Sequence, residues 1–206
     1  MKISERTYNT ADVIAFKSTK EEFGGLSNMA PGYSLRVNDI IIPSAEALYQ
    51  VCRFPLFPHI QEEIISQNSP MTAKMISRKY HGHTRQDWED VKYDIMYWVL
   101  KVKLSQNSEK FYNLLQKTGN SPIVELSNKD KDWAVVPAGH NSLRGKNALG
   151  RLLMQLRSEY VHSDNSIDCV APLNINGFLL YGSEIETVCN PEIEYENHFL
   201  FDLDYA

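Results

Sequence analysis

The chain has 206 residues, of which 43% are hydrophobic and 23% charged, a composition typical of a globular protein with one full core. No run of about 18 apolar residues occurs, and the sequence from Met1 to Arg6 lacks the apolar core of a signal peptide. We therefore expect a soluble, cytosolic protein, and the composition excludes a helix that spans a membrane.

The formal net charge of −5 is unevenly distributed. Residues 1–159 hold all 21 lysines and arginines against 17 acids, whereas residues 160–206 hold nine acids and no base. A mildly basic body suits a phosphate-bearing ligand or a nucleic acid, and an acidic end could shield that surface or bind a basic partner. Two solvated faces without a binding role explain the same pattern.

The first half of the chain alternates extended segments with short helices. Residues 13–16 are strand-like, and residues 33–42 indicate a hairpin with its turn at Asn38-Asp39. Ser44 is a suitable N-cap for a helix over 45–53, after which Pro55 and Pro58 are expected to break the chain. Ser69-Pro70 caps a further helix that continues to about Tyr80.

The longest predicted helix covers residues 87–104, and its buried stripe recurs at helical spacing: Trp88, Val91, Ile95, Trp98 or Val99, and Val102. Lys92 and Lys103 fall on an adjoining face, where they flank a pocket or snorkel from an apolar edge. A helix from Ser108 to Gly119, a strand over 123–125 and a helix from Asn147 to Tyr160 follow.

From about residue 161 the pattern changes to short strand-like runs at 177–181, 185–188, 192–196 and 199–203. We therefore predict an α+β fold with two parts. Residues 1–160 form a helix-dominated catalytic core with a small β element, and residues 161–206 form an acidic, β-rich extension packed on it.

Cysteine and histidine spacing suggests no metal site. Cys52, Cys169 and Cys189 are odd in number and form no Cys-x-x-Cys pair, so buried free thiols are expected rather than a disulfide framework or a zinc knuckle. His81 and His83 have no third ligand nearby. The glycines fit neither a dinucleotide fingerprint nor a phosphate-binding loop, so we predict no metal and no cofactor.

Residues 123–157 hold the parts of a nucleotide pocket. Glu125 ends an apolar strand, Trp133 can stack on a base, and Gly145-Lys146-Asn147 open a helix. The free N–H groups and the dipole of a helix N-terminus favour an anion such as a phosphate. A plain helix cap accounts for the Gly-Lys-Asn sequence equally well.

The sequence resembles the NADAR family, also called the YbiA-like family, over roughly residues 13–158. Five blocks in the family's order carry the resemblance. They are Gly25, Leu26, Ser27 and Asn28 after Phe23; Ser44, Ala45, Glu46, Tyr49 and Gln50; Ser69, Pro70, Met71, Ala73 and Arg78; Asp87, Trp88, Glu89, Val91, Lys92, Met96 and Lys103; and Val124, Glu125, Asp130, Trp133 and residues 145–157.

The resemblance implies N-glycosidase chemistry, the hydrolysis of a bond between a ribosyl anomeric carbon and a nitrogen. Some members are associated with early riboflavin-pathway intermediates. Others remove ADP-ribose from guanine in nucleic acid and so reverse a toxin's modification. The sequence departs from the family in a longer loop at 134–144, which suggests a different leaving group, such as a polymer, and in Arg53, where the family commonly has lysine.

Arg53 limits which mechanisms this chain can use. A lysine amine forms a Schiff base with an opened sugar, whereas a guanidinium stays protonated and cannot be the nucleophile. If the family lysine is covalent, this protein must differ. If it is a charge contact to phosphate or ribose, Arg53 replaces it with bidentate geometry, and we favour this interpretation.

Cleavage of a C–N glycosidic bond passes through an oxocarbenium-like state, which needs a carboxylate to orient water or stabilise positive charge. Glu125 is the first candidate for this role. Glu46, one helical turn from Gln50, is the second and is placed to position ribose hydroxyls. A glutamate in the first turn of a helix is also favoured by the helix dipole alone, by about 0.3–1 kcal/mol.

The remaining candidates are substrate-binding residues. Asn28 with Ser27 contacts base or ribose, or makes a turn. Trp133 stacks on the base, Asp130 positions ribose or a loop, and Trp88 is assigned to the core. Lys92, Lys103, Gly145, Lys146 and Asn147 are candidates for the pocket rim and the diphosphate.

Three functional hypotheses follow. The first is a hydrolase that strips ADP-ribose from guanine in DNA or RNA, antitoxin-like and paired with a cognate ADP-ribosyltransferase toxin. The second is cleavage of a small phosphoribosylamino-pyrimidine of riboflavin synthesis. The third is a non-catalytic module that binds NAD or ADP-ribose.

Overall fold

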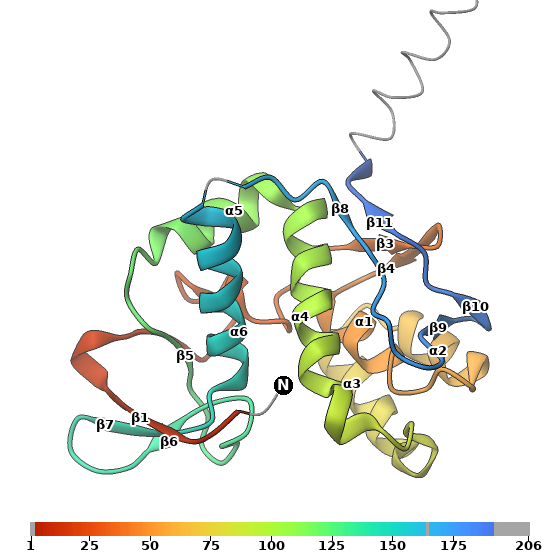
Figure 1. Cartoon of the computed structure of the whole chain (residues 1–206). Coiled ribbons are helices and arrows are strands. Elements are labelled where there is room, and N and C mark those ends of the chain that lie inside the picture. Colours follow the sequence, from red (N-terminus) through yellow and green to blue (C-terminus); the bar gives the residue numbers. More distant parts are fainter. Residues whose placement is uncertain (1–2, 164, 192–206) are drawn as a thin grey trace, which may run out of the picture.

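The structure is a computed structural model that describes residues 3–163 and 165–191. Its helices surround several small sheets, so the predicted α+β class is confirmed (Figure 1). The helices are α1 (Ala45–Val51), α2 (Pro58–Ile65), α3 (Pro70–Lys79), α4 (Trp88–Gln106), α5 (Ser108–Lys117) and α6 (Ala148–Leu156). No helix of the described residues is both long and apolar enough to cross a bilayer.

Two small sheets bring distant parts of the chain together. Strand β2 (Ile14–Phe16) pairs in parallel with β5 (Ile123–Glu125), which places Phe16 opposite Glu125. Strands β1 (Arg6–Asn9), β7 (Ser142–Gly145) and β6 (Val136–Pro137) form an antiparallel sheet in that order. The sequence predicted β2 and β5 but none of the strands of this second sheet.

The hairpin predicted at 33–42 is confirmed as β3 (Leu35–Val37) and β4 (Ile40–Ile42). Asn38 and Asp39 both have positive φ, 47° and 60°, as a two-residue hairpin turn requires. Single 3₁₀ turns occur at η1 (Thr10–Asp12), η2 (Gly24–Leu26) and η3 (His81–His83).

Helix α4 runs through the centre of the fold beside α1 and α6 (Figure 1). Trp98, Val99 and Val102 of the predicted stripe are fully buried. The caps of two other helices also agree with expectation, because Ser44 accepts a hydrogen bond from the N–H of Ala47 at 3.2 Å and Ser69 accepts one from Thr72 at 3.4 Å.

Two helix predictions need correction. Pro58 does not break the chain but begins α2, because a proline in the first turn lacks only an N–H that would have no intrahelical partner. The helix after Asn147 ends at Leu156 and continues as a π-helical turn, η4 (Arg157–Val161). Asn147 itself has φ +51° and makes no side-chain cap.

The described part of the extension packs along α4. Its strands are two residues long: β8 (Cys169–Val170) pairs with β11 (Val188–Cys189), and β9 (Leu179–Leu180) with β10 (Ser183–Glu184). The indole N–H of Trp98 donates to the carbonyl of Ala171 at 3.0 Å. The strands predicted at 192–196 and 199–203 lie outside the described residues.

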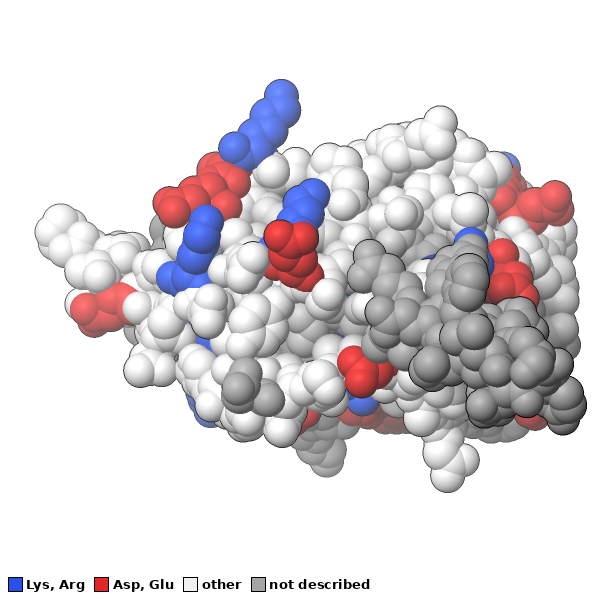
Figure 2. All heavy atoms as spheres, turned by 90° about the horizontal axis from the view of Figure 1, so that it is seen from above, with Lys and Arg blue, Asp and Glu red and all other residues white. Residues whose placement is uncertain are grey.

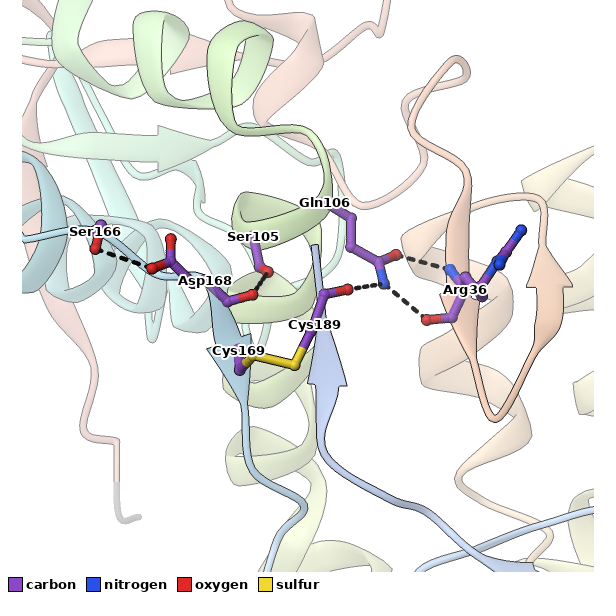
Figure 3. The surroundings of a disulfide bond; sticks show 7 residues. All are labelled: Arg36, Ser105, Gln106, Ser166, Asp168, Cys169 and Cys189. Atoms are coloured by element: carbon purple, nitrogen blue, oxygen red, sulfur yellow. Dashed lines mark hydrogen bonds between the residues drawn. A yellow bond between two sulfur atoms is a disulfide. The ribbon is translucent and has the colours of Figure 1, made fainter. Parts of the chain in front are cut away.

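The cysteine prediction was wrong for two of three residues. Cys169 and Cys189 form a disulfide between β8 and β11 (Figure 3), while Cys52 is a buried free thiol as expected. The antiparallel register places the two half-cystines directly opposite each other with their Cα atoms 4.0 Å apart. They are 20 residues apart in the sequence, so their spacing gave no sign of this pairing.

Two residues at the end of α4 hold the disulfide region (Figure 3). The hydroxyl of Ser105 donates to the carbonyl of Asp168 at 3.0 Å. The amide of Gln106 accepts from the N–H of Arg36 at 2.7 Å and donates to the carbonyls of Arg36 and Cys189. One side chain therefore joins the β3–β4 hairpin to the extension.

Charged side chains are interspersed on the face seen from above (Figure 2). Lysines and arginines lie beside acidic residues there, and most of the described surface in this view is uncharged. This face therefore has no continuous basic field. Charged side chains that could contact a ligand line a cavity instead.

Candidate active site

A cavity of about 390 Å³ opens between α1, α3, the first half of α4 and the end of β5. Its walls combine acidic, cationic and aromatic side chains. The lining residues with a candidate role are Asn28, Glu46, Tyr49, Gln50, Arg53, Lys74, Arg78, Trp88, Glu89, Lys92, Glu125, Asp130 and Trp133. The structure thus brings together Glu125, Glu46, Arg53, Asn28, Lys92, Asp130 and Trp133, as the sequence predicted.

Glu46 lies in the first turn of α1 and is 1% exposed. Its carboxylate accepts hydrogen bonds from the side-chain amides of Asn28 and Gln50, the latter at 2.8 Å, and Lys74 lies 3.9 Å away. Burial raises the pKa of Glu46, and the charge of Lys74 offsets part of this effect. Its position is therefore fixed by three partners.

Lys103 fixes the loop that precedes Asn28, and this loop places the side chain of Asn28 against Glu46. The fully buried side-chain nitrogen of Lys103 donates to the carbonyls of Gly25 at 2.6 Å and Ser27 at 3.1 Å and lies 4.0 Å from the ring centroid of Tyr33. The backbone N–H of Glu46 also donates to the carbonyl of Asn28, which joins this loop to the start of α1.

Lys103 and Ser27 do not line the cavity, so the structure does not place them as ligand contacts. Lys92 and Lys103 share a helix face, but eleven residues separate them by about 16 Å along the axis. Ser27 uses its hydroxyl to accept from the N–H of Met29 at 3.1 Å, which shapes the turn. Both residues support the site from outside.

Glu125 projects into the cavity from the end of β5, and its carboxylate has no hydrogen bond or ion pair with any described residue. Burial raises its pKa to about 7, and the charges of Asp130 and Glu46 add to this effect while Lys74 opposes it. An unpartnered carboxylate that titrates near neutrality can bind a water molecule and exchange a proton with it.

The start of α6 is not a phosphate site, contrary to our prediction for Gly145, Lys146 and Asn147. The N–H groups of Lys146 and Asn147 donate to the carbonyls of Lys131 and Ala134, at 2.7 and 3.3 Å. The ammonium of Lys146 pairs with Asp132 at 2.6 Å. The 131–134 loop folds over the helix start and occupies its donors, which local sequence could not indicate.

The carboxyl of Asp130 accepts from the N–H groups of Asp132 and Trp133, at 2.9 and 3.0 Å. It positions the loop that carries Trp133, one of the two roles we expected. The indole of Trp133 packs edge-on against Tyr49 and Tyr93, with ring centroids 5.5 and 5.2 Å apart. These contacts fix the tryptophan at the cavity wall.

Trp88 is 8% exposed, as expected of a core residue, and also lines the cavity. The guanidinium of Arg53 lies 4.9 Å from its ring centroid, within cation–π range. Arg53 donates further hydrogen bonds to Gln50, Ser77 and Thr84 at 3.3–3.4 Å, and its buried Nε has no partner among the described residues.

Lys74 and Arg78 of α3 line the same cavity, and sequence reasoning gave neither a role. Their spacing of four residues on one helix was the available signal. We call Arg53, Lys74 and Arg78 the cation cluster. Lys92 is paired more closely, with Glu89 at 2.6 Å and Asp132 at 2.9 Å, whereas Lys74 lies 3.9 Å from Glu46.

The 134–144 loop lies mostly away from the cavity. The loop at 134–144, which we expected to reshape the leaving-group site, mostly forms the β6–β7 hairpin beside β1, and only Ala134 of it lines the cavity. Within residues 3–163 and 165–191, no group of three or more His, Cys, Asp or Glu side chains could hold a metal ion.

Comparison with known proteins gives consistent matches. Residues 15–160 match the NADAR domain. N-glycosidase YbiA of Escherichia coli (strain K12) is 35% identical over 147 residues, which cover 71% of this chain and 88% of that protein. The NMR structure of E. coli YbiA superposes with a TM-score of 0.63 at 32% identity and covers 74% of this chain and 88% of that one.

Two longer relatives carry riboflavin names. Riboflavin biosynthesis protein VVA0006 of Vibrio vulnificus (strain YJ016) is 34% identical over 146 residues, which cover 71% of this chain. The chloroplastic riboflavin biosynthesis protein PYRR of Zea mays is 36% identical over 162 residues, which cover 72% of this chain. The chain spans only 38% and 25% of these two proteins.

Proposed function

Because this chain belongs to the NADAR domain family, we propose that it is an N-glycosidase that hydrolyses the bond between a ribosyl anomeric carbon and a nitrogen. The free carboxylate of Glu125 in the cavity is the observation that carries this proposal. The similarity to N-glycosidase YbiA supports the same reaction type.

In the proposed reaction the ionised carboxylate of Glu125 binds a water molecule and stabilises positive charge at the anomeric carbon as the C–N bond lengthens. The bond's electron pair leaves with the nitrogen, which takes a proton from solvent. The water oxygen then bonds to the anomeric carbon and passes one proton to Glu125, which returns it to solvent and is ionised again. Glu46, fixed by Asn28 and Gln50, holds the ribose hydroxyls.

For the substrate we favour an ADP-ribose group on guanine in nucleic acid. The cation cluster supplies three positive charges around Glu46, which suits a diphosphate better than a single phosphate. Trp88 and Trp133 supply two aromatic surfaces for a base. A cognate ADP-ribosyltransferase toxin is then the source of the modified guanine.

The second candidate is a small phosphoribosylamino-pyrimidine of riboflavin synthesis. The riboflavin names of two relatives favour it. So does the position of the 134–144 loop outside the cavity, because this loop was one reason for expecting a polymer.

Incubation with three probes separates these possibilities: an ADP-ribosylated guanine oligonucleotide, the phosphoribosylamino-pyrimidine, and ADP-ribose alone. Release of ADP-ribose from the oligonucleotide supports the favoured substrate, and release of ribose 5-phosphate selects the second. Tight binding of ADP-ribose by calorimetry without turnover of either substrate would contradict N-glycosidase activity and indicate a binding module.

A further inference from the structure

A second cavity of about 660 Å³ lies beside the first, and nothing in the proposed chemistry uses it. Three segments line it. They are residues 55–57 before α2, residues 82–87 between η3 and α4, and Asn176 with Gly177 of the extension.

The walls of this cavity combine apolar and aromatic side chains with polar ones. Leu56 is 73% exposed, more than any other large hydrophobic side chain of the described residues. The ring of His83 packs edge-on against Phe57 with the centroids 4.8 Å apart. An exposed leucine beside two flat rings favours a planar apolar ligand over a hydrated one.

The charge in this cavity is already balanced. Arg85 pairs with Asp87 at 2.5 Å and donates to the carbonyls of Asn176 and Gly177, at 2.7 and 3.5 Å. Its side chain is only 6% exposed. The second cavity therefore suits an uncharged planar group, whereas the cation cluster of the first suits phosphates.

Hydrogen-bonded residues line the two cavities on either side. Arg53 lines the first cavity and donates to the hydroxyl of Thr84, which lines the second, at 3.3 Å. Trp88 faces the first cavity, and its neighbour Asp87 faces the second. The backbone N–H of Arg85 also donates to the carbonyl of Arg53 at 2.9 Å. The two cavities are therefore close enough for linked units of one chain-like ligand to occupy both.

We propose that the second cavity binds a nucleobase of a single-stranded nucleic acid whose modified nucleotide occupies the first cavity. This inference rests on the proposed function and deepens its polymer branch. It also gives the extension a role, because Asn176 and Gly177 lie beyond the NADAR match at 15–160 and complete the cavity wall.

The first test measures binding alone, by fluorescence anisotropy of an unmodified, fluorescein-labelled 12-nucleotide single strand. Leu56→Ala and His83→Ala should each raise the Kd about 5-fold or more, in line with the loss of one stacked base. Leu56→Trp should lower the Kd. Ile41→Ala is the matched control, because Ile41 is 65% exposed on the β3–β4 hairpin and lines neither cavity.

The inference is overturned if the wild type does not bind the strand, or if the Leu56 and His83 variants bind like Ile41→Ala. If heparin displaces the strand equally from the wild type and the variants, and their Kd values are the same, charge alone accounts for the binding. This result would overturn the inference as well. Leu56→Trp keeps the test decisive if either alanine variant folds poorly.

A second test separates this inference from the proposed function. Leu56→Ala and His83→Ala should lower kcat/KM for an ADP-ribosylated oligonucleotide but not for ADP-ribosylated guanosine monophosphate, which cannot reach the second cavity. Equal losses on both substrates would overturn the inference and leave the glycosidase intact. Strand binding that depends on Leu56, without hydrolysis of either substrate, would overturn the proposed function and leave the second cavity as a nucleobase site.

Discussion

The side-chain oxygen of Asn147 accepts the backbone N–H of Glu125 at 3.3 Å, while its amide nitrogen donates to the carbonyl of Ile123 at 2.8 Å. A fully buried residue at the start of α6 thus completes the edge of the strand that presents the proposed catalytic acid. Asn147 is a positioning residue, although the sequence suggested a phosphate contact.

Replacement of Asn147 by glycine tests this role, because glycine keeps the φ of +51° and removes only the side chain. We expect the free energy of unfolding to fall by about 2 kcal/mol and kcat to fall more than KM changes. Chemical denaturation and steady-state kinetics measure the two effects. An unchanged kcat would show that Asn147 does not position Glu125.

Replacement of Lys103 by methionine should destabilise the protein by about 3 kcal/mol, because the buried carbonyls of Gly25 and Ser27 lose their donor. Activity should fall too, since the loop places Asn28 against Glu46. Lys101→Met is the matched control on the same helix. A higher KM without a loss of stability would instead indicate that Lys103 contacts the ligand, as the sequence suggested.

Arg53→Ala should raise KM about 10-fold or more, because charged hydrogen bonds to a phosphate contribute about 1.5–3 kcal/mol. Arg53→Lys should recover part of this loss by restoring the charge without the planar fork. Full activity in Arg53→Ala would exclude Arg53 from substrate binding.

Reduction of the disulfide, or Cys169→Ser, should lower the free energy of unfolding by about 3 kcal/mol, the loop-entropy value for a closed loop of about 20 residues. Thermal unfolding with and without dithiothreitol measures this change, and Cys169→Ser should no longer respond to the reductant. Alkylation followed by mass spectrometry that finds three free thiols in the untreated protein would contradict the pairing.

The raised pKa of Glu125 also predicts a pH-dependent stability. An acid with a pKa of about 7 when folded and 4.5 when unfolded keeps its proton to a higher pH in the folded state. Its contribution to the free energy of unfolding is therefore full below pH 4.5 and is lost as the pH rises through 7. Glu125→Gln should therefore be more stable than the wild type at pH 8, by about 3 kcal/mol, but not at pH 4.5. Denaturation of both proteins at the two pH values checks the sign.

Local signals predicted much of the fold. Ser44 and Ser69 before apolar runs, and Asn38-Asp39 between alternating segments, act through neighbouring backbone groups, so the sequence alone revealed them. Glu46 and Glu125 were each chosen for the chemistry of a glycosidic bond, and no local pattern indicated that they line the same cavity.

The features that sequence reasoning missed depend on contacts between distant residues. The Cys169–Cys189 bond follows from strand register, and the occupied N–H groups of Lys146 and Asn147 follow from a loop folded over α6. Lys103 looked like a rim residue because helical periodicity gives the face of a side chain and not its depth in the fold.

Turnover of an ADP-ribosylated guanine oligonucleotide by wild type and Glu125→Gln, measured from pH 5 to 9, tests the central claim most directly. The account predicts that wild-type kcat/KM rises as the pH passes about 7, where Glu125 ionises, and that Glu125→Gln is slower by about 10²–10⁴ with this rise removed. Wild-type turnover that Glu125→Gln retains, with the same pH profile, would contradict the assignment of Glu125 as the catalytic acid–base group.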